Sequence, residues 1–264
     1  MSSRYTLKPV RVVCNMEIAK DTYLLEVKPL LYLRERPQPL NFFMIWIPRI
    51  DEIPLSIADF DEGRLRFLYK VKGDGTMALT KHCKDMIIGI KGPLGKGIGI
   101  KPAPNTRWLV VAGGIGIAPI PYLIRTYKNY GINVDLLWGV KTADEIFNIY
   151  EFFPDTKGSK TIIVTEDCRY ENGYCGTVID VLKHIEPKNY DGVIAVGPKG
   201  MLKAICLELH KLNPYIGLET LVKCGMGICG SCYVKALDKL LCTDGPVFRC
   251  SEVLEHLKAS DTNC

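Results

Sequence analysis

The sequence has few of the side chains on which acid–base enzymes depend. It contains four histidines, His82, His184, His210 and His256, which are scattered along the chain, and no grouping of His, Asp and Glu stands out. General acid–base catalysis needs a titratable group held against the reacting atoms. We therefore predict no catalytic residue in this chain and expect the four histidines to be structural.

Other absences narrow the class of protein. No run of basic residues with interleaved aromatics indicates a nucleic-acid partner. Residues 1–10 lack the apolar region of a secretory signal, so a cytoplasmic protein is expected. Residues 108–124 are uncharged and reach the lower length limit of a membrane span, but they contain three glycines and two prolines. A buried strand followed by a tight turn explains this stretch better, so no membrane segment is expected.

The overall composition is that of a soluble globular protein. The 264 residues are 47% hydrophobic and 24% charged. This length is enough for one large or two ordinary domains with an ample core. The net charge of +5 indicates solubility more than a particular partner.

Eleven cysteines are present, and four of them lie close together near the C-terminus. Cys224, Cys229 and Cys232 follow a C-x₄-C-x₂-C spacing, and Cys242 comes after nine further residues. This is the plant-type ligand pattern of a 2Fe–2S cluster. Glycines between the ligands allow backbone N–H groups to approach the sulfurs closely. We predict that these four cysteines hold a 2Fe–2S cluster, which carries one electron at a time.

Other interpretations of the cysteines stay open. A structural zinc site usually has two C-x₂-C pairs, whereas this loop has one. A disulfide framework is unexpected in a long chain without a secretory signal. Cys250 is close enough in sequence to Cys242 to be a rival fourth ligand. The cysteines outside the quartet have no clear spacing partner, and we expect most of them to be reduced, buried apolar residues; they are Cys14, Cys83, Cys168, Cys175, Cys206, Cys250 and Cys264.

The first hundred residues predict short β-strands separated by turns. Five segments are rich in β-branched or aromatic residues, and prolines and glycines separate them. Short strands interrupted this often are typical of an antiparallel β-barrel or sandwich. The five predicted strands are residues 11–16, 22–27, 42–47, 64–70 and 86–91.

From about residue 105, apolar strands alternate with helical segments. This alternation predicts a doubly wound parallel α/β sheet with helices on both faces. The glycine and cysteine loop takes over from about residue 215. The predicted strands are residues 107–112, 134–139, 161–165 and 193–196, and the predicted helices are residues 119–130, 146–153, 176–184 and 199–212.

Two glycine turns connect strands of this sheet to the helices that follow them. Gly113, Gly114 and Gly116 follow the first strand, and Gly197 and Pro198 follow the last. Glycine lets the backbone approach a pyrophosphate, and a helix N-terminus favours its negative charge. We predict that both turns lie at the ligand site of the sheet; the alternative is a pair of tight turns that bind nothing.

Two short motifs in the β-rich half indicate a flavin when they are taken together. Ser56, in Pro-Leu-Ser-Ile (54–57), supplies a hydroxyl that suits a flavin ring nitrogen. Gly75 and Thr76, in Gly-Asp-Gly-Thr (73–76), offer backbone and hydroxyl donors to a phosphate. Each motif alone is more often a plain turn.

The order of these motifs resembles the ferredoxin-reductase superfamily. The sequence runs through Pro-Leu-Ser-Ile, Gly-Asp-Gly-Thr, Gly-Pro-Leu-Gly (92–95), the two glycine turns and the cysteine loop. More narrowly, the chain resembles the electron-transfer subunits of NAD-linked dihydroorotate dehydrogenase, especially in Cys-Thr-Asp-Gly-Pro-Val-Phe (242–248). The resemblance covers nearly the whole chain, and the cysteine loop is its most specific part.

The resemblance implies three domains with three cofactors. An FAD-binding β-barrel would span residues 1–103, a nicotinamide-nucleotide-binding α/β domain residues 104–214, and a 2Fe–2S domain residues 215–264. The cofactor-binding residues that it implies are Ile53, Pro54, Leu55, Ser56, Leu68, Tyr69, Lys70, Gly75 and Thr76 for FAD, Gly113, Gly114, Gly116, Gly197 and Pro198 for NAD, and Cys224, Cys229, Cys232 and Cys242 for the cluster.

The resemblance also implies an oxidoreductase subunit with a partner. Electrons would pass from the FMN of a dihydroorotate dehydrogenase catalytic subunit, through the 2Fe–2S cluster and FAD here, to NAD⁺ in pyrimidine biosynthesis. The two kinds of subunit would form a heterotetramer. Two alternatives stay open. One is the small subunit of another flavin and iron–sulfur reductase, such as an NADPH:ferredoxin transhydrogenase, a sulfide dehydrogenase or a cytosolic hydrogenase. The other is a non-enzymatic zinc-binding interaction module.

The chain departs from the pattern of the family at several positions. Ile53 stands where arginine is usual, which removes one charge-assisted contact to the FAD pyrophosphate. Arg49 and Lys70 are the candidates to replace it. Val196 stands where related reductases often have cysteine beside the nicotinamide. These departures leave FAD expected but the final electron acceptor open.

Overall fold

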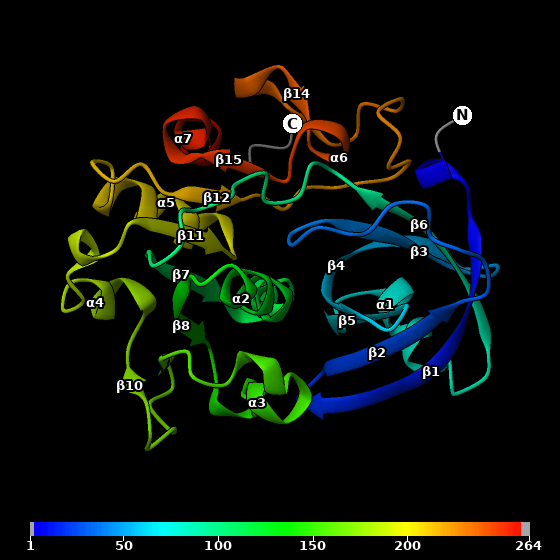
Figure 1. The fold of residues 1–264 in the computed structure, drawn as a ribbon, viewed down its shortest axis with the longest axis horizontal. Coiled ribbons are helices and arrows are strands. Elements are labelled where there is room, and N and C mark those ends of the chain that lie inside the picture. The colour runs from blue at the N-terminus through cyan, green and yellow to red at the C-terminus, as the bar shows by residue number, and fades with distance from the viewer. Residues whose placement is uncertain (1–2, 260–264) are drawn as a thin grey trace.

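The structure, a computed structural model, describes residues 3–259, which form a β-barrel beside an α/β sheet (Figure 1). Six antiparallel strands close the barrel in the order β1-β2-β5-β4-β3-β6. Phe43 and Phe67 pack edge to face inside it, with ring centroids 5.7 Å apart. The predicted antiparallel barrel is confirmed. Its strands are β1 (Lys8–Ala19), β2 (Thr22–Pro29), β3 (Phe42–Ile47), β4 (Asp51–Asp61), β5 (Arg64–Lys70) and β6 (Ile87–Leu94), after a short 3₁₀ turn η1 (Ser3–Tyr5).

Two barrel elements differ from the sequence prediction, which has no strand near residue 55 and only a turn at 73–76. β4 contains Pro54, and proline is uncommon inside a strand because it cannot donate a ladder hydrogen bond. Pro54 nevertheless lies opposite Met44 in the β3–β4 register. Helix α1 (Asp74–Thr80) begins directly after Gly73. Both predicted flavin motifs therefore lie in regular elements, on β4 and at the start of α1.

The second half of the chain forms a seven-stranded sheet in the order β10-β9-β8-β7-β11-β12-β15. Its neighbouring strands are parallel except for the β12–β15 pair. β12 and β15 come from beyond residue 214, so the C-terminal segment extends the sheet. The strands are β7 (Arg107–Gly113), β8 (Asn133–Val140), β9 (Thr161–Thr165), β10 (Tyr174–Cys175), β11 (Gly192–Val196), β12 (Tyr215–Gly217) and β15 (Val247–Arg249).

Helices cover both faces of this sheet. Alternate residues of β7 point to opposite faces: Leu109 packs in the same core cluster as Leu202 of α5, and Val110 packs with Leu123 of α2. The predicted doubly wound arrangement is confirmed. The helices of this region are α2 (Ile120–Asn129), α3 (Ile149–Phe152), α4 (Val178–Leu182) and α5 (Lys199–Glu208), and the 3₁₀ turns are η2 (Gly114–Ile117), η3 (Ala143–Glu145), η4 (Pro154–Thr156) and η5 (Pro187–Asn189).

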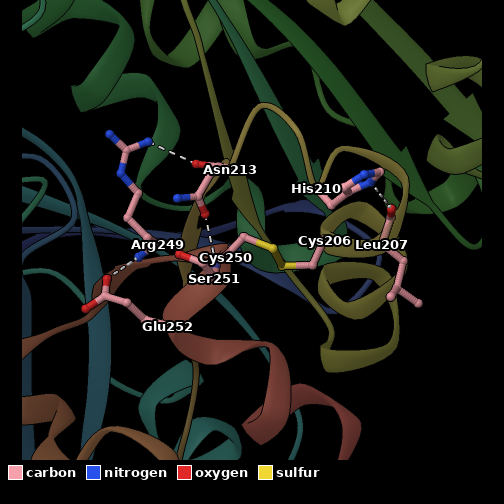
Figure 2. The surroundings of a disulfide bond; sticks show 8 residues. All are labelled: Cys206, Leu207, His210, Asn213, Arg249, Cys250, Ser251 and Glu252. Carbon is pink, nitrogen blue, oxygen red and sulfur yellow. Dashed lines mark hydrogen bonds between the residues drawn. A yellow bond between two sulfur atoms is a disulfide. The ribbon is translucent and has the colours of Figure 1, made fainter.

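The C-terminal segment folds back over the junction between barrel and sheet, at the top of Figure 1. The Cys206–Cys250 disulfide joins α5 to α7, with Cα atoms 5.6 Å apart (Figure 2). Arg249 and Ser251, on either side of Cys250, are held by hydrogen bonds to Asn213. The elements here are β13 (Tyr233–Val234), η6 (Lys235–Leu237), β14 (Lys239–Leu240), α6 (Leu241–Asp244) and α7 (Cys250–Lys258).

The cysteines outside the quartet do not all behave as expected. Cys206 and Cys250 are buried, as predicted, but they are joined rather than reduced. Cys168 and Cys175 form a second disulfide at the exposed surface. The expectation of reduced thiols is therefore wrong for these four, and the expectation of burial is wrong for Cys168 and Cys175. Cys14 and Cys83 are free, and Cys264 lies outside the described residues.

The uncharged stretch at 108–124 divides between β7, η2 and α2, as the glycines and prolines predict. Among residues 3–259, no helix is long and apolar enough to cross a membrane.

Candidate functional site

The cysteine loop lies against the end of the barrel. A Cβ atom added to Gly225 would lie 2.7 Å from Cδ1 of Leu94 in β6 and 3.1 Å from Cγ of Met44 in β3. Gly225 also has a φ of +66°, a conformation that favours glycine. The loop is therefore closely fitted to the barrel at the residue that follows Cys224. This fit explains why a glycine stands between the first two ligands.

The four thiols form two pairs of unequal burial. Cys229 is exposed, and its pKa is lowered to about 6 by hydrogen bonding to Ser231 and to Cys224. Cys242 is buried, and burial together with a hydrogen bond to Cys232 raises its pKa to about 12. The thiols therefore lie as a Cys224–Cys229 pair near the surface and a Cys232–Cys242 pair beneath it.

The spacing of the four cysteines favours a dinuclear cluster over a single ion. In the part of the chain that the structure describes, no three His, Cys, Asp or Glu side chains converge as ligands of one metal ion, so the structure itself does not bring the quartet into a closed site. Structural zinc needs four ligands around one centre, whereas a 2Fe–2S cluster needs thiolates distributed over two irons. Two backbone N–H groups also donate to ligand sulfurs, from Met226 to Cys224 (3.3 Å) and from Cys242 to Cys232 (3.5 Å). The residues present fit the predicted cluster. The rival ligand Cys250 is bonded to Cys206 instead.

Seven of the nine predicted flavin residues line a cavity of about 230 Å³ beside the barrel. β4 places Ser56 in its wall, and α1 contributes Thr76. Ile53 and Gly75 are not among the lining residues, but they touch each other beside the cavity: Cγ2 of Ile53 is 2.8 Å from the position of a Cβ on Gly75. The predicted residues that line the cavity are Pro54, Leu55, Ser56, Leu68, Tyr69, Lys70 and Thr76.

The five predicted nucleotide residues line a second cavity of about 590 Å³ at the carboxyl ends of β7 and β11. A Cβ on Gly116 would lie 2.4 Å from the carbonyl oxygen of Val196, so the two strand ends meet at this glycine. Gly113 likewise leaves room for Met201, whose sulfur would lie 2.6 Å from an added Cβ. The carboxyl ends of neighbouring parallel strands are where doubly wound sheets bind their ligands.

The two cavities adjoin and share four lining residues, Lys70, Lys72, Ile115 and Glu219. Lys70 forms an ion pair with Glu145 of η3 at 2.7 Å, which links the barrel to the sheet. Glu219 is exposed at the cavities, where partial desolvation by their walls raises its pKa, and the nearby charge of Lys72 partly offsets this effect. Lys72, Glu145 and Glu219 are not predicted from the sequence, although two of them stand beside a recognisable motif: Lys72 directly precedes Gly-Asp-Gly-Thr, and Glu219 lies five residues before Cys224.

The cysteine loop and the flavin cavity also share a wall. Val222, two residues before Cys224, and Leu241, next to Cys242, both line the cavity. The thiol quartet, the flavin cavity and the nucleotide cavity therefore form a continuous series.

Comparison with known proteins agrees with this geometry. Residues 219–254 match the model of the iron-sulfur cluster binding domain of dihydroorotate dehydrogenase B. The chain is 33% identical over 262 residues to the dihydroorotate dehydrogenase B (NAD⁺) electron transfer subunit of Clostridium acetobutylicum, covering 96% of this chain and 99% of the relative. It is 33% identical to the same subunit of Geobacillus thermodenitrificans, with 92% and 96% covered.

Solved structures give the same fold. A chain of the NADH-dependent reduced ferredoxin-NADP oxidoreductase, a flavin-based electron-bifurcating enzyme, superposes with a TM-score of 0.79 at 27% identity, covering 92% of this chain and 88% of that one. A ferredoxin NADP⁺ reductase from Neisseria gonorrhoeae, solved with FAD and NADP, has a TM-score of 0.64 at 14% identity, with 78% and 91% covered; this likeness concerns the fold alone. Identity above 30% along almost the full length shows that the chain belongs to the family of dihydroorotate dehydrogenase B electron transfer subunits.

Proposed function

We propose that this chain carries electrons from a dihydroorotate dehydrogenase catalytic subunit to NAD⁺. The route runs from the FMN of the partner, where dihydroorotate is oxidised to orotate for pyrimidine biosynthesis, through a 2Fe–2S cluster and FAD in this chain. The observation that carries the proposal is the series of adjoining sites. The cysteine loop shares a wall with the flavin cavity, which in turn shares four lining residues with the nucleotide cavity.

The barrel would hold FAD through the predicted residues on β4, β5 and α1. Ser56 lines the cavity, and its hydroxyl would bind the flavin ring. Thr76, at the start of α1, would meet a phosphate through its backbone N–H, because its hydroxyl donates to the carbonyl oxygen of Gly73 and is not the free donor that the sequence predicts. Flavin supplies two-electron hydride chemistry and one-electron exchange, and the cluster supplies one-electron steps. The full set proposed to contact FAD is Ile53, Pro54, Leu55, Ser56, Leu68, Tyr69, Lys70, Gly75 and Thr76.

The glycine turns would hold NAD. Gly113, Gly114 and Gly116 follow β7, and Gly197 and Pro198 follow β11, so they present backbone where a pyrophosphate can approach. Cys224 and Cys229 would bind one iron, and the Cys232–Cys242 pair the other.

The proposal keeps the division into an FAD domain (1–103), a nicotinamide-nucleotide domain (104–214) and a 2Fe–2S domain (215–264). The complex would lie in the cytoplasm as a heterotetramer of catalytic and electron-transfer subunits. Because a one-electron hop requires proximity, the exposed Cys229 end of the cysteine loop would face the partner.

Reconstitution tests the proposal. The FMN-containing catalytic subunit is purified alone, and dihydroorotate-dependent reduction of NAD⁺ is followed with and without this chain. We expect NAD⁺ reduction only when both are present, and a brown electron-transfer subunit. NAD⁺ reduction at the full rate without this chain would contradict the proposal. A colourless chain containing zinc would instead support a zinc-binding interaction module.

One observation favours a second candidate, the small subunit of a transhydrogenase. The likeness to the NADH-dependent reduced ferredoxin-NADP oxidoreductase extends over 92% of this chain at 27% identity. The partner that co-purifies from native cells separates the candidates, because a dihydroorotate-oxidising FMN subunit fits the first and a ferredoxin-reacting subunit fits the second.

A further inference from the structure

The flavin site of this chain lacks a cation on β4. FAD carries two negative charges on its pyrophosphate, and charge-assisted hydrogen bonds from cationic side chains are the strongest hydrogen bonds to such a group. Position 53 is isoleucine, whose side chain packs against Gly75. The carboxylate of Asp51 is close to the same point, with Oδ2 3.1 Å from a Cβ added to Gly75. The start of α1 therefore has an aliphatic and an acidic neighbour on β4, so the positive charge must come from elsewhere.

Two candidate cations can be set aside from their surroundings. Arg49 lies in the β3–β4 connection, is exposed, and lines neither cavity. Lys70 lines both cavities, but its ammonium lies 2.7 Å from the Glu145 carboxylate, and both side chains are largely buried. This ion pair neutralises most of the charge that Lys70 could offer to a phosphate.

Lys72 remains, and its backbone is fixed next to the phosphate motif. The N–H groups of Lys72 and Gly73 both donate to Oγ1 of Thr76, at 2.9 and 3.1 Å. Lys72 is exposed, as Arg49 is, but unlike Arg49 it lines both cavities. Its ammonium makes no hydrogen bond or ion pair to any residue within 3–259. Its positive charge acts on Glu219, whose pKa it lowers. Among the described residues that line the flavin cavity, Lys70 and Lys72 are the two cations.

We propose that Lys72 supplies the positive charge that holds the FAD pyrophosphate, in place of the arginine that Ile53 replaces. This inference rests on the proposed FAD site and assigns a residue that was not among the predicted flavin contacts. Lysine acts on a phosphate as a point charge, whereas arginine forms two parallel hydrogen bonds in a fixed geometry. A lysine can therefore bind the pyrophosphate from position 72, directly before the Gly-Asp-Gly-Thr motif, and does not need the position of residue 53.

FAD affinity, rather than turnover, tests this assignment. The full chain is freed of flavin and titrated with FAD and, separately, with riboflavin, which has no pyrophosphate. We expect Lys72→Gln to weaken FAD binding roughly tenfold or more, because a lost hydrogen bond to a charged group has effects of this size. Riboflavin affinity should not change. Lys84→Gln is the matched control, since Lys84 is an exposed lysine of the same half that lines neither cavity.

Two further variants test whether another cation restores FAD affinity. Lys72→Arg should keep FAD affinity close to that of the parent chain. Ile53→Arg, added to Lys72→Gln, should recover most of the lost affinity by restoring a cation beneath the same turn. Recovery would separate a charge effect from damage to the fold.

Three results would overturn the assignment. Lys72→Gln could bind FAD as tightly as Lys84→Gln, or lose riboflavin affinity to the same extent as FAD affinity, or lose affinity for NAD⁺ while keeping FAD, which would place Lys72 at the nucleotide phosphates instead. Failure of the proposed FAD site looks different, because the unaltered chain would then bind no FAD at all, and failure of the electron route to NAD⁺ would leave FAD binding and its dependence on Lys72 unchanged.

Discussion

The cysteine loop and the two cofactor cavities are built in different ways. The four thiols come from a span of nineteen residues, whereas the flavin cavity collects residues from Phe42 to Pro246. The loop offers side chains whose spacing along the chain sets their geometry. The cavities offer strand ends, glycine backbone and apolar walls that meet only when the barrel and the sheet have folded. A local site can therefore be recognised from spacing, and an assembled one mainly from motifs that belong to known folds.

The largest expected effect concerns the loop. Cys229→Ser should abolish the cluster, because a 2Fe–2S centre needs all four thiolates, while the barrel and its flavin stay in place. Iron analysis should fall from two per chain towards zero, with the flavin spectrum retained. Cys83→Ser is the control, since Cys83 is also an exposed free thiol. If Cys229→Ser kept a full iron content, the ligand assignment would be wrong.

The next effect concerns the disulfide that encloses the loop. Cys206 and Cys250 are 44 residues apart and bracket all four ligands, whereas Cys168 and Cys175 are 7 apart. In the chain-entropy model, loss of the longer link costs about 4 kcal/mol of unfolding free energy and loss of the shorter about 2 kcal/mol. Cys206→Ala should therefore destabilise more than Cys168→Ala in urea unfolding. Equal effects, or a larger one for Cys168→Ala, would show that the longer link does not hold the C-terminal segment.

A glycine substitution at the nucleotide cavity gives the sharpest test of how the cavities are assembled. Gly116→Ala places a methyl group 2.4 Å from the Val196 carbonyl oxygen, so the strand ends must separate. We expect a destabilisation of about 1–3 kcal/mol and a clear loss of NAD⁺ affinity. Gly200→Ala is the matched control, because Gly200 lines the same cavity with nothing within 4 Å of the added atom. Calorimetric titration with NAD⁺ should separate the two variants, and similar affinities would contradict the close approach.

The smallest effect concerns a single hydroxyl. Ser56→Ala should weaken flavin binding by about 1 kcal/mol, which is close to the net contribution of one hydrogen bond. The flavin absorption bands and affinity report on it. Thr80→Ala serves as the control, because Thr80 lies at the end of α1 and lines neither cavity. An unchanged spectrum and affinity in Ser56→Ala would remove Ser56 from the flavin site.

The sequence predicts the site unevenly, for physical reasons. The cysteine spacing and the strand–glycine–helix pattern are local; the glycine turns that the pattern singles out line the nucleotide cavity, and their role there stays a prediction. β4 is not predicted, because Pro54 and the acidic residues at its ends are uncommon in strands. Pairing with β3 nevertheless stabilises it. The Cys206–Cys250 link and the shared residue Glu219 depend on which elements become neighbours. No spacing along the chain encodes that arrangement.

Electron paramagnetic resonance of the iron-loaded chain, after anaerobic reduction with dithionite, shows directly whether the four thiols hold a 2Fe–2S cluster. We predict the rhombic signal of one reduced 2Fe–2S cluster per chain, lost in Cys229→Ser and retained in Cys83→Ser. An iron-loaded chain without this signal would contradict the central claim that these four thiols hold a one-electron carrier.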